Sequence, residues 1–550
     1  MNPSPLLARR YVLTGQVQGV GFRPFVYRVA NQLGLQGWVR NHPAGAEILA
    51  AGARESLYAF EAALRGELPF PARVERLLVD EKACPPEQPG FHIESSERGG
   101  ERTATLLPDL ATCPACLAEI RDPANRRHRY PFTNCTACGP RYSILLELPY
   151  DRARTTMHAF RMCPACRREF GDPADRRFHA QPNACPACGP QLALWDAQGR
   201  TVARRDEALA EAVAHLRRGG IVAVKGLGGF HLMGDATNEA AVRELRRRKH
   251  REEKPLAVMV ADADAAAALA HLDETERQWI TSPTAPIVLL RKKPSKLAES
   301  IAPGHPCVGL MLPYTPLHHL LLSDIDRPLV ATSGNISDEP MCTDEHEALE
   351  RLRGIADFFL VHDRPIAQPV DDSVLRVVLG RPLMLRVARG FAPLTLPLDG
   401  EARPGTTLAV GAHMKAALAL HHGNRIVVSP HIGDLETVPA WQAFERNLDV
   451  LERLYDTRAD RVVCDRHPHY ASTHYAERRD PDPLKVQHHH AHILAVMAEH
   501  GLEGPVLGIA WDGTGYGDDG TIWGGEVLRV DRAGFTRIAH LRTFDLPGGD

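Results

Sequence analysis

The sequence lacks the segments that direct a protein into or across a membrane. Residues 1–10 contain no apolar core of the kind that a secretory signal carries. No stretch of the chain approaches the roughly 18 consecutive apolar residues of a membrane span. We therefore expect a cytoplasmic protein with no membrane partner, whose cysteines stay reduced.

The chain also lacks a bias of charge. Its 65 lysines and arginines nearly balance its 68 aspartates and glutamates, so the formal net charge is −3. A chain with this balance has no general attraction to nucleic acid or to an acidic membrane surface. With 550 residues, of which 44% are hydrophobic, it is long enough for about three to five domains, each with a core.

Cysteine is scarce outside one repeated unit. Two copies of a CxxC…CxxC pattern lie within residues 113–188. The RDPANRR segment at 121–127 in the first copy is repeated as GDPADRR at 171–177 in the second. Each copy offers four thiolates, the donor set of a tetrahedral zinc site, and a cytosolic chain disfavours disulfides. The predicted zinc ligands are Cys113, Cys116, Cys135, Cys138, Cys163, Cys166, Cys185 and Cys188. The remaining cysteines, which we expect to be core thiols, are Cys84, Cys307, Cys342 and Cys464.

The pairing of the zinc ligands stays open at this point. Each ion could be bound within one repeat or by cysteines of both, and we favour binding within each repeat because each is self-sufficient. Four cysteine ligands leave no open position for water, so both sites should be structural and the doubled module should be a rigid connector. Residues 113–190 hold 12 arginines against 7 acidic residues. We interpret these arginines as a solvated shell around the metal scaffold rather than as a nucleic-acid face.

Residues 9–95 have the pattern of a small α+β domain. We expect strands at 11–17, 37–41, 46–51, 74–79 and 91–95. One helix should begin at Pro24, and a second should carry Leu57, Phe60 and Leu64 on its apolar face. The β-α-β-β-α-β order predicts a ferredoxin-like sandwich.

The first loop of this domain carries a resemblance. QGVGFR, followed by WVRN in the next strand, resembles the acylphosphatase signature. The resemblance implies that Arg23 clamps a phosphoryl group and that Asn41 orients the attacking water, because glycine-rich turns point backbone N–H groups at phosphates. The phosphate-binding turn would consist of Gly19, Val20, Gly21 and Phe22.

Residues 200–390 have an α/β pattern with several polar glycine turns. A buried strand at 220–225 precedes a glycine turn, a helix ends in the basic run 246–251, and a strand from Leu329 opens into a Ser-Gly-Asn turn. A basic run at a helix end can simply complement the helix dipole. However, KGLGGFHLMGDA, KHREEKP, PYTPLHHLL and ATSGN together resemble the YrdC-like nucleotide-binding domain.

That resemblance implies a reaction and a site. The family joins a small carbamate-type acid to ATP, giving an acyl-adenylate and pyrophosphate, with magnesium accompanying the ATP. Cationic side chains suit this chemistry because they offset the triphosphate charge. The implied nucleotide-binding residues are Lys225, Lys249, Arg251, Lys254, Ser333 and Asn335.

The last segment, residues 402–550, combines strands with a histidine run. Strands at 407–415, 416–420 and 425–429 are typical of the first hairpins of an actin-like lobe. On a helix, His488 and His492 would share one face, which is metal-chelating geometry, although a histidine run alone is often only solvated.

With Asp512 downstream, the histidine run resembles the metal site of the Kae1-like carbamoyl-transferring domain. The resemblance implies that His488, His492 and Asp512 bind one iron or zinc ion. About 150 residues suffice for one of two actin-like lobes. We therefore expect further ligands and part of the nucleotide cleft to be missing from this sequence.

The four segments in this order resemble the HypF-type carbamoyltransferases of nickel–iron hydrogenase maturation. We assign residues 1–96 to an acylphosphatase-like segment, 97–198 to a paired zinc-finger segment, 199–390 to a YrdC-like segment and 391–550 to an incomplete Kae1-like segment. The resemblance implies hydrolysis of carbamoyl phosphate to carbamate and adenylation of the carbamate. It also implies transfer of the carbamoyl group to a cysteine thiolate of the partner HypE, toward the cyanide ligands of the hydrogenase iron.

Because carbamate and acyl-adenylates are labile in water, we also expect an internal path between the sites. Two other functions would use some of these segments. A tRNA-modifying enzyme that forms threonylcarbamoyladenosine would use the YrdC-like and Kae1-like segments but has no need of Arg23. A zinc-dependent nucleic-acid-binding protein would use the cysteine repeat alone. Neither alternative accounts for all four segments.

Overall fold

The computed structural model describes residues 7–545, with gaps at 43, 70, 82–83, 96–104, 338, 399–403 and 532. The chain divides into two units, one of residues 1–393 with 453–456 and one of residues 394–452 with 457–550. The predicted boundary at 96–97 lies outside the described residues, and the other boundaries stay predictions. Among the described helices, none has both the length and the apolarity that crossing a membrane requires.

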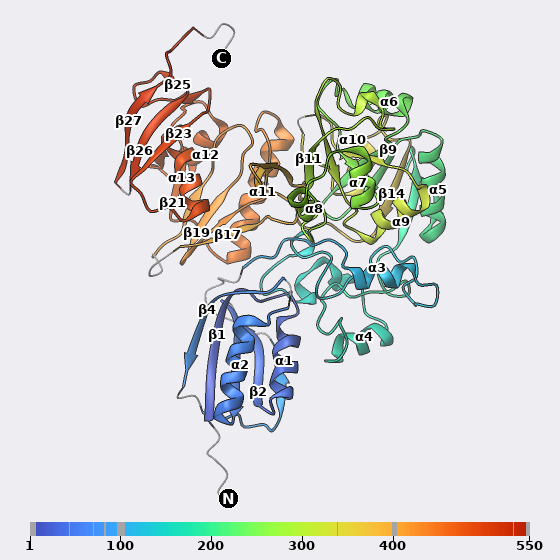
Figure 1. The fold of residues 1–550 in the computed structure, drawn as a ribbon, viewed down its shortest axis with the longest axis vertical. Helices are drawn as coiled ribbons and strands as arrows, with labels where there is room; N and C mark the ends of the chain where they lie inside the picture. The colour runs from blue at the N-terminus through green and yellow to red at the C-terminus, as the bar shows by residue number, and fades with distance from the viewer. Residues whose placement is uncertain are drawn as a thin grey trace, which may run out of the picture. The chain divides into compact units, whose positions relative to one another are not determined.

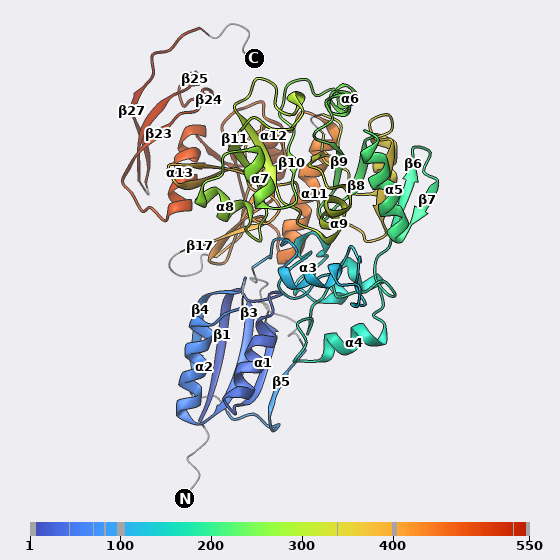
Figure 2. The same ribbon diagram turned by 45° about the vertical axis from the view of Figure 1, so that its right-hand side comes forward.

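The acylphosphatase-like segment folds as the predicted ferredoxin-like sandwich. A five-stranded sheet in the order β4-β1-β3-β2-β5 has both helices on one face (Figures 1 and 2). Every pair is antiparallel except β2 with β5, which are parallel. Buried apolar side chains, among them Leu13, Val26 and Phe60, fill the space between sheet and helices. The elements are β1 (Leu7–Gln16), α1 (Phe22–Gln32), β2 (Gln36–His42), β3 (Gly45–Gly52), α2 (Arg54–Gly66), β4 (Arg73–Asp80) and β5 (Phe91–Ile93).

The zinc segment has little regular structure, and its two repeats fold alike. In each repeat the first cysteine caps a short helix and a proline follows as its first residue, where its fixed φ suits the helix start. The elements are α3 (Pro114–Arg121), the 3-10 helices η1 (Tyr142–Ile144), η2 (Arg152–Arg154) and η3 (Thr156–Ala159), and α4 (Pro164–Gly171).

The YrdC-like segment is an α/β fold built on an eleven-stranded mixed sheet, ordered β16-β15-β11-β12-β10-β13-β9-β8-β14-β6-β7. Successive residues of its strands point to opposite faces of the sheet, and each face packs against its own hydrophobic core. Val222 and Val224 pack with α5, α9 and zinc-segment residues, whereas Ala223 packs with α6 on the other face. One face of this sheet is thus completed by the zinc segment, which lies between the two sheets of the first unit (Figure 1).

The elements of this segment agree with the predicted pattern. The strands are β6 (Leu192–Asp196), β7 (Thr201–Arg204), β8 (Val222–Lys225), β9 (Phe230–Asp235), β10 (Val258–Met259), β11 (Ile287–Arg291), β12 (Cys307–Met311), β13 (Leu329–Ser333), β14 (Phe358–His362), β15 (Val374–Val378) and β16 (Arg381–Arg386). The helices are α5 (Arg205–Arg217), α6 (Glu239–Lys249), α7 (Ala263–Leu269), α8 (Glu274–Ile280), η4 (Glu299–Ile301), α9 (Pro316–Ile325) and α10 (Glu345–Arg351).

The second unit contains a six-stranded sheet in the order β17-β20-β19-β18-β21-β22. The first four strands of this order pair antiparallel and the last two join in parallel. A three-stranded sheet, β23-β26-β27, and a two-stranded sheet, β24-β25, follow along the chain. The strands are β17 (Leu394–Pro397), β18 (Thr407–Ala409), β19 (Ala419–His422), β20 (Arg425–Val428), β21 (Arg461–Asp465), β22 (Leu484–Val486), β23 (Val506–Ala510), β24 (Gly515–Tyr516), β25 (Ile522–Trp523), β26 (Glu526–Asp531) and β27 (Gly534–His540). The helices are α11 (Val438–Tyr455), α12 (Ala471–Arg479) and α13 (His488–His500).

Two sequence predictions are corrected. The strand expected at 407–415 stops at Ala409, because Gly411 and Lys415 adopt positive φ. In addition, Cys84 is exposed rather than a core thiol, because it lies in an irregular, proline-rich loop before β5. The other three scattered cysteines are buried as expected.

Candidate functional site

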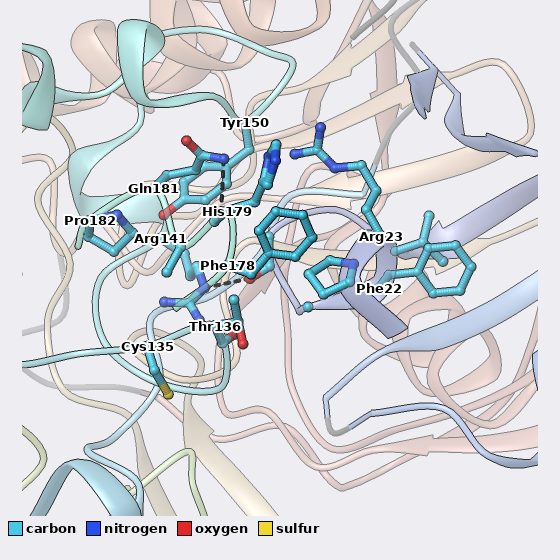
Figure 3. A pocket seen from close by; sticks show the side chains of 15 residues that line it. Phe22, Arg23, Cys135, Thr136, Arg141, Tyr150, Phe178, His179, Gln181 and Pro182 are labelled. Atoms are coloured by element: carbon cyan, nitrogen blue, oxygen red, sulfur yellow. Dashed lines mark hydrogen bonds between the residues drawn. The ribbon is translucent and has the colours of Figure 1, made fainter. Parts of the chain in front are cut away.

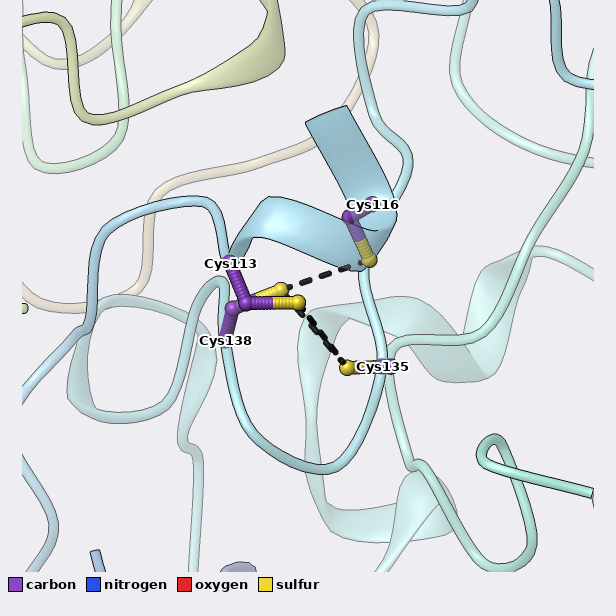
Figure 4. Close-up of side chains that lie close together, drawn as sticks. All are labelled: Cys113, Cys116, Cys135 and Cys138. Carbon is purple, nitrogen blue, oxygen red and sulfur yellow. Dashed lines mark hydrogen bonds between the residues drawn. The ribbon is translucent and has the colours of Figure 1, made fainter. Parts of the chain in front are cut away.

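The eight repeat cysteines form two clusters, each from one repeat. Figure 4 shows the first cluster, Cys113, Cys116, Cys135 and Cys138. In the first, the Sγ–Sγ distances are 3.7 Å for Cys113–Cys135, 3.8 Å for Cys135–Cys138 and 3.5 Å for Cys138–Cys116. A tetrahedron with Zn–S bonds of about 2.3 Å has edges of about 3.8 Å, whereas a disulfide needs about 2.05 Å. The second cluster has the same spacing, 3.6 to 3.8 Å. The clusters therefore fit two structural zinc ions, and binding within each repeat is the correct pairing.

Arginines of each repeat reach the zinc cluster of the other. Arg126 donates to Cys166 Sγ at 3.4 Å, and Arg176 donates to Cys116 Sγ at 3.2 Å. The same arginines pair with a glutamate of the opposite repeat, Glu169 and Glu119 respectively. A four-thiolate zinc site carries a net negative charge, so these N–H···S contacts are favourable.

The neighbouring Arg127 and Arg177 repeat this exchange from more buried positions. Although burial opposes it, hydrogen bonds from Arg127 and Arg126 lower the pKa of Glu169 to about 2. The local excess of arginine is thus partly used to hold the two repeats together, not left as a basic face for nucleic acid.

The Gly19–Arg23 loop packs against the second CxxC turn of the first repeat with its flanks, residues 133–141, which is called the zinc-binding turn below (Figure 3). Gly19 and Gly21 have φ of 67° and 73°. A Cβ on Gly19 would come within 2.9 Å of Tyr150, and one on Gly21 within 3.1 Å of Thr136. Glycine is therefore needed both for the backbone conformation and for this close packing.

Arg23 and Asn41, the predicted catalytic residues, are both buried. Arg23 lies in the first turn of α1 with its Nη2 3.7 Å from Asp151 Oδ1, and burial lowers its pKa. Neither polar atom of the Asn41 side chain has a hydrogen-bond partner among the described residues. A buried amide of this kind normally binds a water or a ligand, which suits the predicted role.

The zinc-segment residues around this loop were not predicted from local motifs. Arg141 donates from Nε to Gly19 O at 2.9 Å, from Nη1 to Cys138 O at 2.8 Å and from Nη2 to Thr136 O at 2.7 Å. His179 lies beside Arg23, and burial together with that cation lowers its pKa to about 4. These residues follow Arg23 by more than a hundred positions, so only the tertiary fold brings them to the loop.

Three of the six predicted nucleotide-binding residues lie together. Lys249 Nζ donates to Ser333 O, Asn335 O and Asn335 Oδ1, each at 2.7 Å, and Ser333 Oγ donates to Asn335 Oδ1 at 2.7 Å. Burial, helped by Arg251, lowers the pKa of Lys249 to about 7. Lys254 is exposed nearby, and its charge also lowers the pKa of Lys249.

Lys225 has other partners. Its Nζ contacts the carboxylate of Glu345 and donates to His362 O at 3.1 Å. The side chain is 2% exposed and lines a pocket that the zinc segment also borders. The predicted group therefore divides into an assembled cluster around Lys249 and a separate ion pair at Lys225.

The histidine run begins α13, as predicted, and faces Asp512. His488 Nε2 lies 3.0 Å and His492 Nε2 3.5 Å from Asp512 Oδ2. The three side chains are a possible metal-binding set. Sequence reasoning missed Asp465, whose Oδ2 is 2.7 Å from His488 Nδ1 and raises the pKa of this imidazole. A carboxylate on Nδ1 leaves Nε2 available as a ligand.

Five family models match the chain. Acylphosphatase matches residues 9–93, HypF finger matches 112–145 and 162–195, and the model described as Telomere recombination matches 214–388. The HypF Kae1-like domain matches 402–499, and the second subdomain of the carbamoyltransferase Kae1-like domain matches 508–550.

Curated relatives match over nearly the whole chain. Carbamoyltransferase HypF of Synechocystis sp. is 54% identical over 539 residues, which cover 97% of this chain and 70% of the relative. Carbamoyltransferase HypF2 of Cupriavidus necator is 48% identical over 575 residues, which cover 100% of this chain and 70% of the relative. The chain belongs to the HypF carbamoyltransferase family. It is therefore a transferase with an acylphosphatase domain.

HypF crystal structures agree with the fold. Full-length HypF in its phosphate- and nucleotide-bound form superposes with a TM-score of 0.93 at 43% identity, covering 98% of this chain and 70% of that one. HypF of T. kodakarensis gives a TM-score of 0.90 at 40% identity, covering 99% and 70%. HypF membership accounts for all four segments, which neither alternative function does.

Proposed function

We propose that this HypF-family chain performs the carbamoyl transfer in three steps, each at one of the clusters described above. Carbamoyl phosphate is hydrolysed to carbamate and phosphate at the Gly19–Arg23 loop. Carbamate then reacts with ATP and magnesium around Lys249, giving carbamoyl-adenylate and pyrophosphate. The carbamoyl group finally passes to a cysteine thiolate of the partner HypE, on the way to the cyanide ligands of a nickel–iron hydrogenase.

The geometry of the loop supports the first step. The N-terminus of α1 and the backbone N–H groups of residues 19–22 favour an anion, and Arg23 adds a cation in a buried setting. The Asn41 amide, which no described residue engages in a hydrogen bond, would hold the attacking water. Asp151 pairs with Arg23 in the absence of phosphate, and an arriving phosphoryl group would take over this guanidinium.

The cluster around Lys249 supports the second step. Cations at Lys249, Arg251 and Lys254 offset the triphosphate charge and stabilise the departing pyrophosphate. Ser333 and Asn335 hold the Lys249 ammonium in place through three 2.7 Å contacts. The related HypF structure in a phosphate- and nucleotide-bound form is consistent with both sites.

The third step concerns the second unit. His488, His492 and Asp512 would hold one iron or zinc ion, with Asp465 fixing the tautomer of His488. When bound, such an ion supplies positive charge for phosphate or carbonyl oxygens. The residues themselves fit it, because two imidazole nitrogens and a carboxylate oxygen converge within 4.8 Å.

The observation that carries the proposal is the presence of a phosphate loop and a lysine–serine–asparagine cluster in one compact unit. ATP–pyrophosphate exchange with carbamoyl phosphate as the trigger tests it. Arg23→Ala should abolish the exchange, and ammonium carbamate should restore it by supplying the product of the first step. Lys249→Ala should lose the exchange with either trigger. An exchange rate that depends neither on carbamoyl phosphate nor on the Arg23 substitution would refute the order of steps.

A further inference from the structure

Arg364, just after β14, is a buried cation without a hydrogen-bonded acid. Its side chain is 5% exposed, and its Nε has no hydrogen-bond partner among the described residues. The acids that influence it, Asp109 and Asp363, act through charge alone. Asp109 accepts from Ser143 Oγ at 2.8 Å, and Asp363 accepts from Gln191 N at 2.8 Å.

An unpaired buried guanidinium is unusual. Removing an ion from water is costly unless a counter-charge or hydrogen bonds replace the lost hydration. Two arginines that are at least as buried follow this rule: Arg127 pairs with Glu169, and Arg389 pairs with Asp372. Burial lowers the pKa of Arg364 to about 10, which still leaves it charged at neutral pH.

Arg364 lines a pocket between the zinc segment and the YrdC-like segment. Residues 131–134, 139 and 140 border it on one side, and residues 225–227, 314–317 and 362 on the other. Two more buried polar atoms of its lining, Asn134 Oδ1 and His362 Nδ1, have no hydrogen-bond partner within the described part of the chain. The ring of Phe132 lies 5.4 Å from the Arg364 guanidinium.

We propose that Arg364 binds a small planar monoanion of the carboxylate type, and that carbamate is its ligand during the reaction. This inference rests on the proposed function for the identity of the ligand. Lys225, the other cation of the lining, is paired with Glu345, so Arg364 is the lining cation for which the described residues show no ion pair. A carboxylate matches that charge and the two-pronged shape of a guanidinium. A dianion such as orthophosphate would leave excess negative charge in a buried site.

The position of the pocket suits an intermediate that passes between two sites. Thr136 and Arg141 line the pocket at the Gly19–Arg23 loop, whereas Asn134, Gly139 and Pro140 line the pocket at Arg364. The same zinc-binding turn therefore borders both. Carbamate released beside Arg23 would thus form next to a turn that also lines the Arg364 pocket.

The lining also suits the chemistry of carbamate. In water, carbamate takes up a proton on nitrogen and its C–N bond breaks, giving ammonia and carbon dioxide. Phe132, Leu227 and Leu317 make much of the lining apolar, which limits access of water and its protons. A guanidinium held on the carboxylate further lowers the basicity of the nitrogen.

Thermal unfolding of the 550-residue chain with added bicarbonate, the closest stable analogue of carbamate, tests the proposal without ATP or carbamoyl phosphate. The rise in Tm that depends on Arg364, obtained by comparing the wild type with Arg364→Gln, should be larger for bicarbonate than for orthophosphate or chloride at equal ionic strength. Arg364→Gln should weaken bicarbonate binding by about tenfold or more, as expected for loss of a charge-assisted contact. Without the anion, Arg364→Gln should melt no lower than the wild type, because it removes a desolvated charge that has no ion-pair partner.

Two further variants serve as controls. Arg364→Lys keeps the charge and should retain part of the bicarbonate effect. Arg129→Gln removes an arginine paired with Asp206 and Asp324, outside the pocket lining. It should lower Tm while keeping the full bicarbonate effect.

An Arg364→Gln variant that responds to bicarbonate like the wild type would overturn the proposal, and so would equal stabilisation by orthophosphate through Arg364. Failure of pyrophosphate exchange alone would count against the reaction sequence and not against this binding site.

Discussion

At the scale of single residues, the first unit holds several cations in buried positions where their charge is costly. Lys249 is the one whose charge state changes near neutral pH, because burial and Arg251 lower its pKa to about 7. Its contacts with Ser333 and Asn335 position the ammonium but add no counter-charge. A phosphate group would supply that charge, so a bound nucleotide should favour the protonated form.

A pH titration of ATP binding follows from this residue. Since Lys249 is protonated below its pKa and neutral above it, ATP affinity should fall as the pH rises from 6 to 8.5, by roughly tenfold. Lys249→Arg keeps a cation throughout this range and should flatten the profile. The measurement is the Kd for ATP by calorimetry at each pH. A wild-type profile as flat as that of Lys249→Arg would show that Lys249 does not titrate there.

At the scale of elements, the two zinc repeats stabilise one another. Two arginines of each repeat contact the glutamate and the thiolates of the other, so each zinc site receives its outer hydrogen bonds from its neighbour. The first repeat also holds the phosphate loop through Arg141. The segment that carries a structural metal site thus helps to position the proposed phosphate loop.

Zinc release from the first cluster tests this cross-connection. Arg176→Gln changes the second repeat, yet it removes the 3.2 Å contact to Cys116 of the first. Loss of such an outer partner typically weakens metal affinity by about 10- to 100-fold. We expect faster zinc transfer to a chromogenic chelator, with one of the two ions affected most. Arg168→Gln, an exposed arginine of α4, is the matched control and should leave the rate unchanged. Equal rates in both variants would contradict the connection.

Local signals in the sequence were enough for the parts of the sites that lie within one loop or one helix. The CxxC spacing, the GVGFR turn and the i,i+4 histidines each encode their geometry over a few residues. Asp465, Arg141 and Arg364 could not be found in this way. Each acts through a tertiary contact with a distant segment, and an isolated arginine or aspartate is usually a solvated surface residue.

At the scale of the whole molecule, the first unit places two pockets on either side of one zinc-binding turn. One pocket lies at the phosphate loop and the other at Lys225 and Arg364, with residues 133–141 of that turn contributing to both linings. Because carbamate is short-lived in water, such an arrangement favours direct passage over release and recapture. We therefore expect the carbamate formed by the chain to be used before it mixes with carbamate in solution.

Isotope dilution measures this passage directly. The chain is given ¹³C-labelled carbamoyl phosphate and ATP in a large excess of unlabelled ammonium carbamate, and hydroxylamine traps the activated carbamoyl group as hydroxyurea. If carbamate passes internally, the ¹³C fraction of the hydroxyurea will exceed that of the carbamate in solution, and Arg23→Ala will abolish the labelled product. A ¹³C fraction equal to that of the bulk carbamate would show that the intermediate leaves the protein, contrary to the path inferred from the two pockets.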